Sequence, residues 1–154
     1  MNKDIFLKTQ LVATIANIDA NTKPLWGKMN LQQMVEHMSR DAFKVASGKT
    51  SFPLMSPLEH IPKLQDFIRS DKPFRENTVN RLMAADPLPL VHTKMDAALI
   101  ELQGEIDYFF NVYDKQPELK VLNPIFGDLD FELQIQLLHK HSVHHLRQFG
   151  VELQ

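Results

Sequence analysis

Four stretches of the chain carry apolar residues at intervals of three and four positions and contain no proline. They cover residues 1–23, 25–52, 90–116 and 125–154. This spacing places apolar side chains on one face of an α-helix, whereas a half-buried strand alternates apolar and polar residues. No such alternation and no internal repeat is present in the sequence. The pattern therefore predicts an all-α protein with four helices.

Capping residues set the expected helix ends. The second helix is predicted to begin after Asn30 and to end at Gly48, and the fourth to begin near Asp128 or Asp130 and to end at Gly150. The third is expected to start at about residue 91. The predicted core faces, helix by helix, are Ile5, Leu7, Leu11, Ala13, Ile15 and Ile18; Leu31, Met34, Val35, Met38, Ala42 and Val45; Met95, Ala98, Leu99, Leu102, Ile106 and Phe109; and Phe131, Ile135, Leu138, Ser142, Leu146 and Phe149.

Residues 48–90, here called the proline-rich segment, separate the second and third helices. Six of the nine prolines fall between positions 53 and 89, so only short helices are expected there, at 63–70 and 75–85. The other two links are short and favour antiparallel neighbours, while a link of this length permits a crossover between parallel helices. The connections therefore predict a single domain (1–154) folded as an up-down-down-up four-helix bundle.

The proline-rich segment is also rich in apolar residues, among them Phe52, Leu64, Phe67, Ile68 and Phe74. A free linker would not carry so many. We therefore expect the segment to be ordered against the helices and to form one wall of a ligand pocket.

Composition narrows the class of protein. The chain has 154 residues, is 44% hydrophobic and carries a net charge of −2, which is typical of one globular domain. A nucleic-acid binder that relies on a strongly basic surface is not expected. Because the chain contains no cysteine, disulfides and thiolate metal sites are excluded.

Targeting signals are not evident in the sequence. The first eight residues mix charged and apolar side chains, unlike a secretory signal, and no run of 18 apolar residues exists to span a membrane. The expectation is a cytoplasmic protein with no membrane partner.

The histidines are the candidate metal-ligating residues. Of seven, four lie between positions 139 and 145, and among these His141 and His145 have the four-residue spacing that places two imidazoles on one helix face. His37 lies on the second helix, where Asp41, one turn later, is positioned to orient its ring. His139 and His144 are expected to project off the shared face.

The remaining polar residues near this pattern are assigned as follows. Gln134 and Gln148 share the polar shoulder of the fourth helix with the histidine pair, as expected for groups that support metal ligands. Glu36 is expected to be solvated. His60 and His92 are interpreted as surface residues. By spacing alone, His141 and His145 remain open to a second interpretation, a structural pair or part of a solvated face, and a metal site needs His37 as a third ligand.

Three blocks of sequence resemble the DinB/YfiT-like superfamily of small metalloproteins, in a branch catalogued as a domain of unknown function. They are residues 26–29 with 33–37, residues 123–129, and residues 141–150 with their His-x-x-x-His followed by Gln148. With the helix spacing, the resemblance covers nearly the whole chain. It implies the same up-down-down-up four-helix bundle and a metal triad formed by His37, His141 and His145.

The resemblance also implies a function. Three neutral imidazoles suit zinc, nickel or iron(II), and three protein ligands leave a coordination position for water or substrate. Superfamily relatives include thiol S-transferases and hydrolase-like enzymes, so metal-assisted transfer or hydrolysis on a small molecule is expected, with a low-molecular-weight thiol as one partner and a homodimer as the assembly. The alternative is a non-enzymatic, metal-stabilised bundle that binds a ligand or a protein. No general base is identified.

Overall fold

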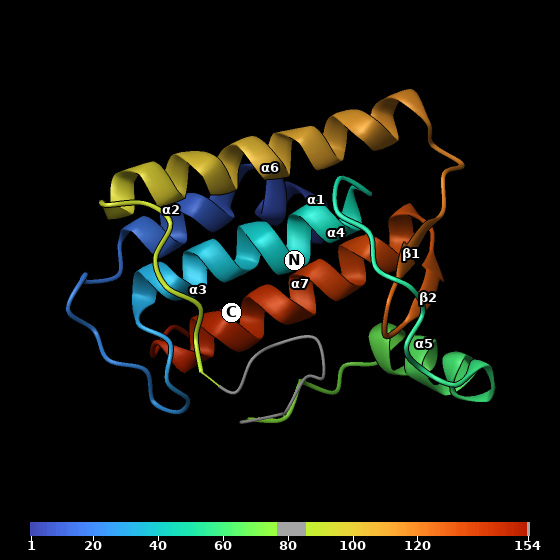
Figure 1. Cartoon of the computed structure of the whole chain (residues 1–154), viewed down its shortest axis with the longest axis horizontal. Coiled ribbons are helices and arrows are strands. Elements are labelled where there is room, and N and C mark those ends of the chain that lie inside the picture. The colour runs from blue at the N-terminus through green and yellow to red at the C-terminus, as the bar shows by residue number, and fades with distance from the viewer. Residues whose placement is uncertain (77–85, 154) are drawn as a thin grey trace.

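The computed structural model describes residues 1–76 and 86–153, and this part of the chain is mostly helical, as predicted (Figure 1). The first helical stretch consists of α1 (Lys3–Ile5), the π-helical turn η1 (Phe6–Gln10) and α2 (Leu11–Ala16). The second consists of α3 (Leu31–His37), the π-helical turn η2 (Met38–Phe43) and α4 (Lys44–Ala46). The two longest helices are α6 (Met95–Lys115) and α7 (Phe131–Gln148).

The capping residues act where the sequence indicated. Asn30 accepts a hydrogen bond from the Gln33 backbone N–H, and the Gln33 side chain accepts one from the Asn30 N–H, which forms a capping box. Asp130 caps α7 through the Leu133 backbone N–H. Reciprocal caps of this kind satisfy backbone donors that a helix start leaves unpaired.

One predicted core residue and one predicted helix start were wrong. The first helical stretch ends at Ala16, directly before Asn17, but Ile5, assigned to its core face, is 51% exposed. The π-helical turn η1 follows directly after Ile5 and changes the angular spacing on which that assignment rested. The third helix begins at Met95 rather than near Val91. Residues 86–92 are a non-helical connection, and Val91 and His92 are hydrogen-bonded to Glu36 of α3.

The all-α prediction also needs a correction between α6 and α7. Strands β1 (Val121–Asn123) and β2 (Gly127–Leu129) pair antiparallel around the turn at residues 124–126. The Asn123 side-chain oxygen accepts hydrogen bonds from the Ile125 and Phe126 backbone N–H groups and fixes this turn. Three-residue strands are too short to show an alternating pattern, so periodicity gave no signal for them.

Two hydrophobic clusters hold these elements together. The larger one lies among the four helical stretches and includes Leu11, Met34, Phe43, Leu102 and Phe109. The smaller one joins the proline-rich segment to the hairpin and the start of α7 through Ile68, Phe126, Leu129, Leu133 and Leu137. Ile68 is fully buried, so this part of the proline-rich segment is packed against the helices.

The described parts of the proline-rich segment contain the turn η3 (Leu58–His60) and helix α5 (Ile61–Arg69), close to the helix predicted at 63–70. Most of the helix predicted at 75–85 lies outside the described residues. In Figure 1, α5 lies beside the hairpin and the first turns of α7. Within the described residues, no helix is both long and apolar enough to cross a membrane.

The expectation that Glu36 is solvated was wrong. Its side chain is 5% exposed, and its two carboxylate oxygens accept hydrogen bonds from the backbone N–H groups of Val91 and His92, at 2.7 and 3.1 Å. Gln32 donates to the His92 carbonyl oxygen at 2.8 Å and to Glu36 at 3.1 Å. The side of α3 that faces away from the core therefore holds the chain just before α6.

Candidate metal centre

His37, His141 and His145 meet between α3 and α7. His37 is the last residue of α3, and the other two lie one turn apart on α7. The Nε2 atom of His37 is 3.1 Å from the Nε2 atom of His141 and 3.1 Å from that of His145. Among the described residues, these three are the ones whose ring nitrogens converge closely enough to hold one ion. The three predicted ligands are thus brought together.

The separation of the nitrogens fits a bound metal ion. Two imidazole nitrogens bonded to zinc at about 2.0–2.1 Å lie roughly 3.3 Å apart at a tetrahedral angle and roughly 3.0 Å apart at a right angle. The observed 3.1 Å lies between these values. The spacing therefore fits both geometries, and three imidazole nitrogens suit zinc, nickel and iron(II) alike.

Asp41 fixes the His37 imidazole, as the sequence predicted. An ionised carboxylate only accepts hydrogen bonds, so His37 donates its Nδ1–H to Asp41 Oδ2 at 2.9 Å. The Arg40 guanidinium donates two hydrogen bonds to the same oxygen, at 2.9 and 3.1 Å. With the proton on Nδ1, the lone pair of Nε2 is left free to face the other two histidines.

The local backbone contributes to this arrangement. Asp41 lies in the π-helical turn η2, which begins directly after His37. Single π-helical turns inserted into α-helices occur frequently at functional sites. No residue pattern in the sequence indicates this turn.

Gln148 fixes the His145 imidazole in the same way. The Gln148 amide nitrogen donates to the Trp26 carbonyl oxygen at 3.0 Å, which assigns its Oε1 as the atom that faces His145. His145 donates its Nδ1–H to that oxygen at 2.9 Å. His145 and Gln148 are both buried, at 6% and 4% exposure. The Nε2 lone pair of His145 therefore also faces the centre.

Burial and mutual repulsion favour the uncharged imidazoles. Burial, followed by the charge that His145 and His37 would carry, holds the pKa of His141 well below its usual range. Burial and the neighbouring His37 do the same to the pKa of His145. Metal ligation requires the neutral ring, so both groups are in the ligating form at neutral pH.

Asp41 is also in its charged form at neutral pH. Burial would raise the pKa of this carboxyl group, but its hydrogen bonds from His37 and Arg40 outweigh burial and lower the pKa. Three hydrogen bonds, one from His37 and two from Arg40, reach the same oxygen Oδ2 and favour the charged carboxylate. We therefore assign Asp41 to orienting His37, as the sequence predicted, and not to proton transfer.

The other histidines lie outside the ligand cluster. The His139 ring packs edge-on against Phe6, 5.8 Å between centroids, and burial lowers its pKa to about 4. His144 lies beside Trp26, with ring centroids 5.5 Å apart. His60 is exposed, as expected. His92 was expected at the surface but is half-buried, with its Nε2 atom 2.8 Å from Glu101 Oε2.

The proline-rich segment reaches the histidines through Phe74. Its ring is perpendicular to the rings of His141 and His144, with 5.9 Å between centroids in each pair. Phe67 of α5 packs on the far side of Phe74 at 5.5 Å. The proline-rich segment is therefore ordered against the histidines, whereas the ligand pocket that it was expected to wall stays a prediction.

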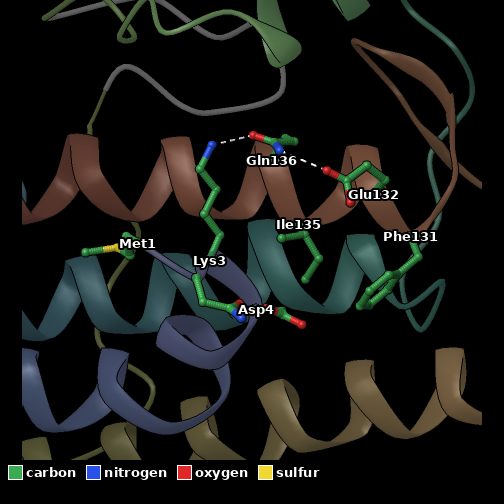
Figure 2. A pocket seen from close by; sticks show the side chains of 8 residues that line it. Met1, Lys3, Asp4, Phe131, Glu132, Ile135 and Gln136 are labelled. Carbon is green, nitrogen blue, oxygen red and sulfur yellow. Dashed lines mark hydrogen bonds between the residues drawn. The ribbon is translucent and has the colours of Figure 1, made fainter.

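A cavity of about 320 Å³ lies elsewhere, between the start of the chain and the first two turns of α7. Figure 2 shows Lys3 donating to the side-chain oxygen of Gln136 across this cavity, with Phe131 and Ile135 lining it. The histidines are on the last three turns of the same helix. This cavity is therefore separate from the histidine cluster.

Comparisons of the chain with profiles of known protein families, with curated proteins and with solved structures gave no match. The resemblance to the DinB/YfiT-like superfamily consequently rests on the sequence blocks described above. The histidine cluster is defined by its own geometry and does not depend on that resemblance.

Proposed function

We propose that His37, His141 and His145 bind one divalent metal ion, which is zinc, nickel or iron. The observation that carries this proposal is the convergence of three ring nitrogens, with His37 Nε2 3.1 Å from the Nε2 atoms of both His141 and His145. Since Asp41 and Gln148 hold the protons of His37 and His145 on Nδ1, two Nε2 lone pairs face each other across 3.1 Å. Such lone pairs repel each other unless a cation lies between them.

We further propose that the protein is a metal-dependent enzyme that acts on a small molecule by transfer to a low-molecular-weight thiol or by hydrolysis. Three protein ligands leave at least one coordination position open, as in catalytic rather than structural zinc sites. A bound metal would there lower the pKa of a water molecule or hold a thiol as the thiolate. The substrate class and a homodimeric assembly belong to this proposal.

The chain's own groups have distinct roles in this proposal. Asp41 and Gln148 keep the imidazoles of His37 and His145 in the ligating tautomer and orientation. Phe74 shields one side of His141 from water. Arg147, in the last turn of α7, is paired with Glu152 at 3.1 Å and has a structural role.

The DinB-like, up-down-down-up four-helix bundle is part of the same proposal. Its support is that the α3–α4 stretch and α6 lie side by side in Figure 1 and follow the same direction along the chain colours, while α7 runs the opposite way. α3 and η2 pack against α6, and α2 also contacts α6. The proline-rich segment would then be the crossover between the two parallel helical stretches.

The burial of the ligands favours a second candidate. His37 and His145 are 3% and 6% exposed, and Phe74 packs over His141. A metal ion enclosed in this way would stabilise the helices without turnover, and the protein would act by binding a ligand or a partner. The two candidates differ in whether a coordination position is accessible from solvent.

Two measurements test the proposal in sequence. Element-resolved metal analysis of protein purified without a nickel column is expected to find about one zinc, nickel or iron per chain, and His37→Ala is expected to remove it. Cobalt(II)-loaded protein is then titrated with 2-mercaptoethanol. A sulfur-to-cobalt charge-transfer band indicates an open position and supports the enzyme, whereas an unchanged spectrum supports the enclosed, non-enzymatic site.

A further inference from the structure

The corner between the first two helical stretches is bound to the last turn of α7 at one residue, Gln148. The Leu25 backbone N–H donates to the Gln148 carbonyl oxygen at 2.7 Å. The Gln148 side-chain amide donates to the Trp26 carbonyl oxygen at 3.0 Å. The same amide accepts from His145 Nδ1–H through its oxygen. One buried side chain therefore joins the Leu25–Gly27 corner to a metal ligand.

Gly27 allows this contact to be so close. A Cβ atom at this position would lie 2.8 Å from Gln148 Nε2, nearer than a real Cβ atom comes to such a neighbour. The end of a free glutamine would swing aside at little cost. Gln148 is 4% exposed and hydrogen-bonded at both ends of its amide, so any displacement breaks one of those bonds.

We propose that the Trp26–Gly27 corner is a positioning element for the metal ligand His145, acting through Gln148. The proposal rests on the metal site proposed above and deepens it. Trp26 supplies the carbonyl group that orients the amide, and Gly27 supplies the space in which the amide lies. The oriented amide then holds the His145 proton on Nδ1 and leaves Nε2 to ligate.

A consequence is that the corner and the metal site are thermodynamically coupled. Displacing the Gln148 oxygen removes the acceptor for Nδ1–H, and the ring can then carry its proton on Nε2, where it blocks ligation. Loss of a group that orients a metal-ligating histidine typically reduces metal affinity by about 10- to 100-fold.

The test compares Gly27→Ala with Gly48→Ala. Both glycines have a positive φ, 77° and 78°, and both substitutions introduce the same backbone strain. A Cβ at Gly48 would meet Val121 at an ordinary 3.6 Å, away from Gln148. Zinc affinity is measured by competition with a chelator, and the His145 tautomer by ¹⁵N NMR of the metal-free protein.

We expect Gly27→Ala to raise the zinc Kd about tenfold and to shift His145 from the Nδ1–H towards the Nε2–H tautomer. Gly48→Ala is expected to change neither, although both variants lose thermal stability. In a Gln148→Ala background, Gly27→Ala is expected to have no further effect on zinc affinity, because the amide that it displaces is gone. Gln148→Ala alone gives the same tautomer shift if Gly27→Ala does not fold.

Equal zinc affinities for Gly27→Ala and Gly48→Ala, or independent losses from Gly27→Ala and Gln148→Ala, would overturn the inference. An unchanged His145 tautomer in Gln148→Ala would overturn it as well. If the proposed function fails, the wild-type protein binds no zinc at this site. The His145 tautomer of the metal-free protein still tests whether the Trp26–Gly27 corner positions His145.

Discussion

The position of a single proton decides what each histidine in the cluster can do. His37 and His145 each donate Nδ1–H to a fixed acceptor, Asp41 in one case and Gln148 in the other. Both rings therefore present a lone pair at Nε2, the atom that lies 3.1 Å from its neighbour. Replacing a histidine of this cluster should therefore affect metal binding more than replacing a histidine whose ring packs elsewhere.

The first prediction separates the histidines of α7. His145→Ala should abolish high-affinity metal binding, because two imidazoles and water bind a divalent ion far less tightly than three imidazoles. His139→Ala and His144→Ala should leave binding nearly unchanged, since the rings of these residues pack on Phe6 and Trp26 instead. Calorimetric titration of the three variants is the measurement. Equal losses in all three would mean that the histidines bind metal as a non-specific cluster.

At the scale of single residues, the three histidines of the cluster could be predicted from the sequence, but not all of the residues that contact them. The four-residue spacing of His141 and His145, and of His37 and Asp41, depends on helix geometry alone, and the structure has both pairs as expected. Glu36 was misplaced because a helical projection places it away from the core face, and nothing in the projection indicates that a distant segment covers that side. The contact of Phe74 with His141 is likewise set by the folding of a long link.

Single elements of the structure are held by few, identifiable groups. The chain before α6 is fixed to α3 by the Glu36 carboxylate and the Gln32 amide. His92 also contacts Glu101 of α6, whose carboxylate lies 3.6 Å from Lys44 Nζ. The sequence identified the helices on either side, whereas these links between them come from the tertiary structure.

The second prediction concerns Glu36. Glu36→Gln keeps the shape of the side chain but replaces one carboxylate oxygen with a donor that faces the Val91 or His92 N–H group. Hydrogen bonds to a charged group contribute about 1.5–3 kcal/mol, so we expect the free energy of unfolding to fall by about 2 kcal/mol at neutral pH. Urea denaturation measures the free energy of unfolding. The control is Glu59→Gln, which changes an exposed residue of the proline-rich segment.

The pH dependence of this difference has a definite sign. Burial would raise the pKa of Glu36, but the hydrogen bonds from Val91, Gln32 and His92 outweigh burial and lower it from its ordinary value of 4.5. A lowered pKa gives stability that is fully present above pH 4.5 and is lost as the pH falls through the folded-state value. The difference between wild type and Glu36→Gln should therefore shrink in acid. A constant difference down to the acid transition would contradict this assignment.

The third prediction concerns the order of the proline-rich segment. Ile68 is fully buried, and the Lys140 ammonium group donates to the backbone oxygens of Ser70 and Lys72. Amide hydrogen exchange in residues 61–70 should accordingly be slowed well beyond that of a flexible loop. Val91 and His92 should also be protected, because their backbone N–H groups donate to the Glu36 carboxylate. Uniformly fast exchange across both stretches would contradict the packing of the proline-rich segment against the helices.

On the scale of the whole molecule, the histidine cluster joins segments that are far apart in the chain. His37 and His141 are separated by 104 residues, and α3 and α7 meet at the histidines. A ligand that binds only the folded protein stabilises it by mass action, by about 2.7 kcal/mol at 100 times Kd. Folding and metal binding should therefore be linked across the larger hydrophobic cluster.

The fourth prediction follows from this linkage. Zinc at about 100 times Kd should raise the Tm by roughly 5–10 °C, since 1 kcal/mol corresponds to about 2–4 °C for a chain of this size. Differential scanning calorimetry with and without zinc measures the shift. His145→Ala is the matched control, and a shift of the same size in that variant would place the stabilising metal elsewhere.

Much of the overall architecture could be predicted from the sequence, because amphipathic helices with strong caps are local features. Asn30 and Asp130 show this directly, each capping its helix at the indicated position. The hairpin and the π-helical turns could not be predicted, since their strands and turns are too short for a periodic signal. The same holds for the Gly27–Gln148 contact, which joins residues 121 positions apart.

The most direct test of the metal site is an anomalous difference map, measured above the zinc edge, from crystals of the protein loaded with one equivalent of zinc. The account predicts a single strong peak about 2.0–2.1 Å from the Nε2 atoms of His37, His141 and His145. A peak at His139, His144 or another surface group, with no density between these three nitrogens, would contradict it.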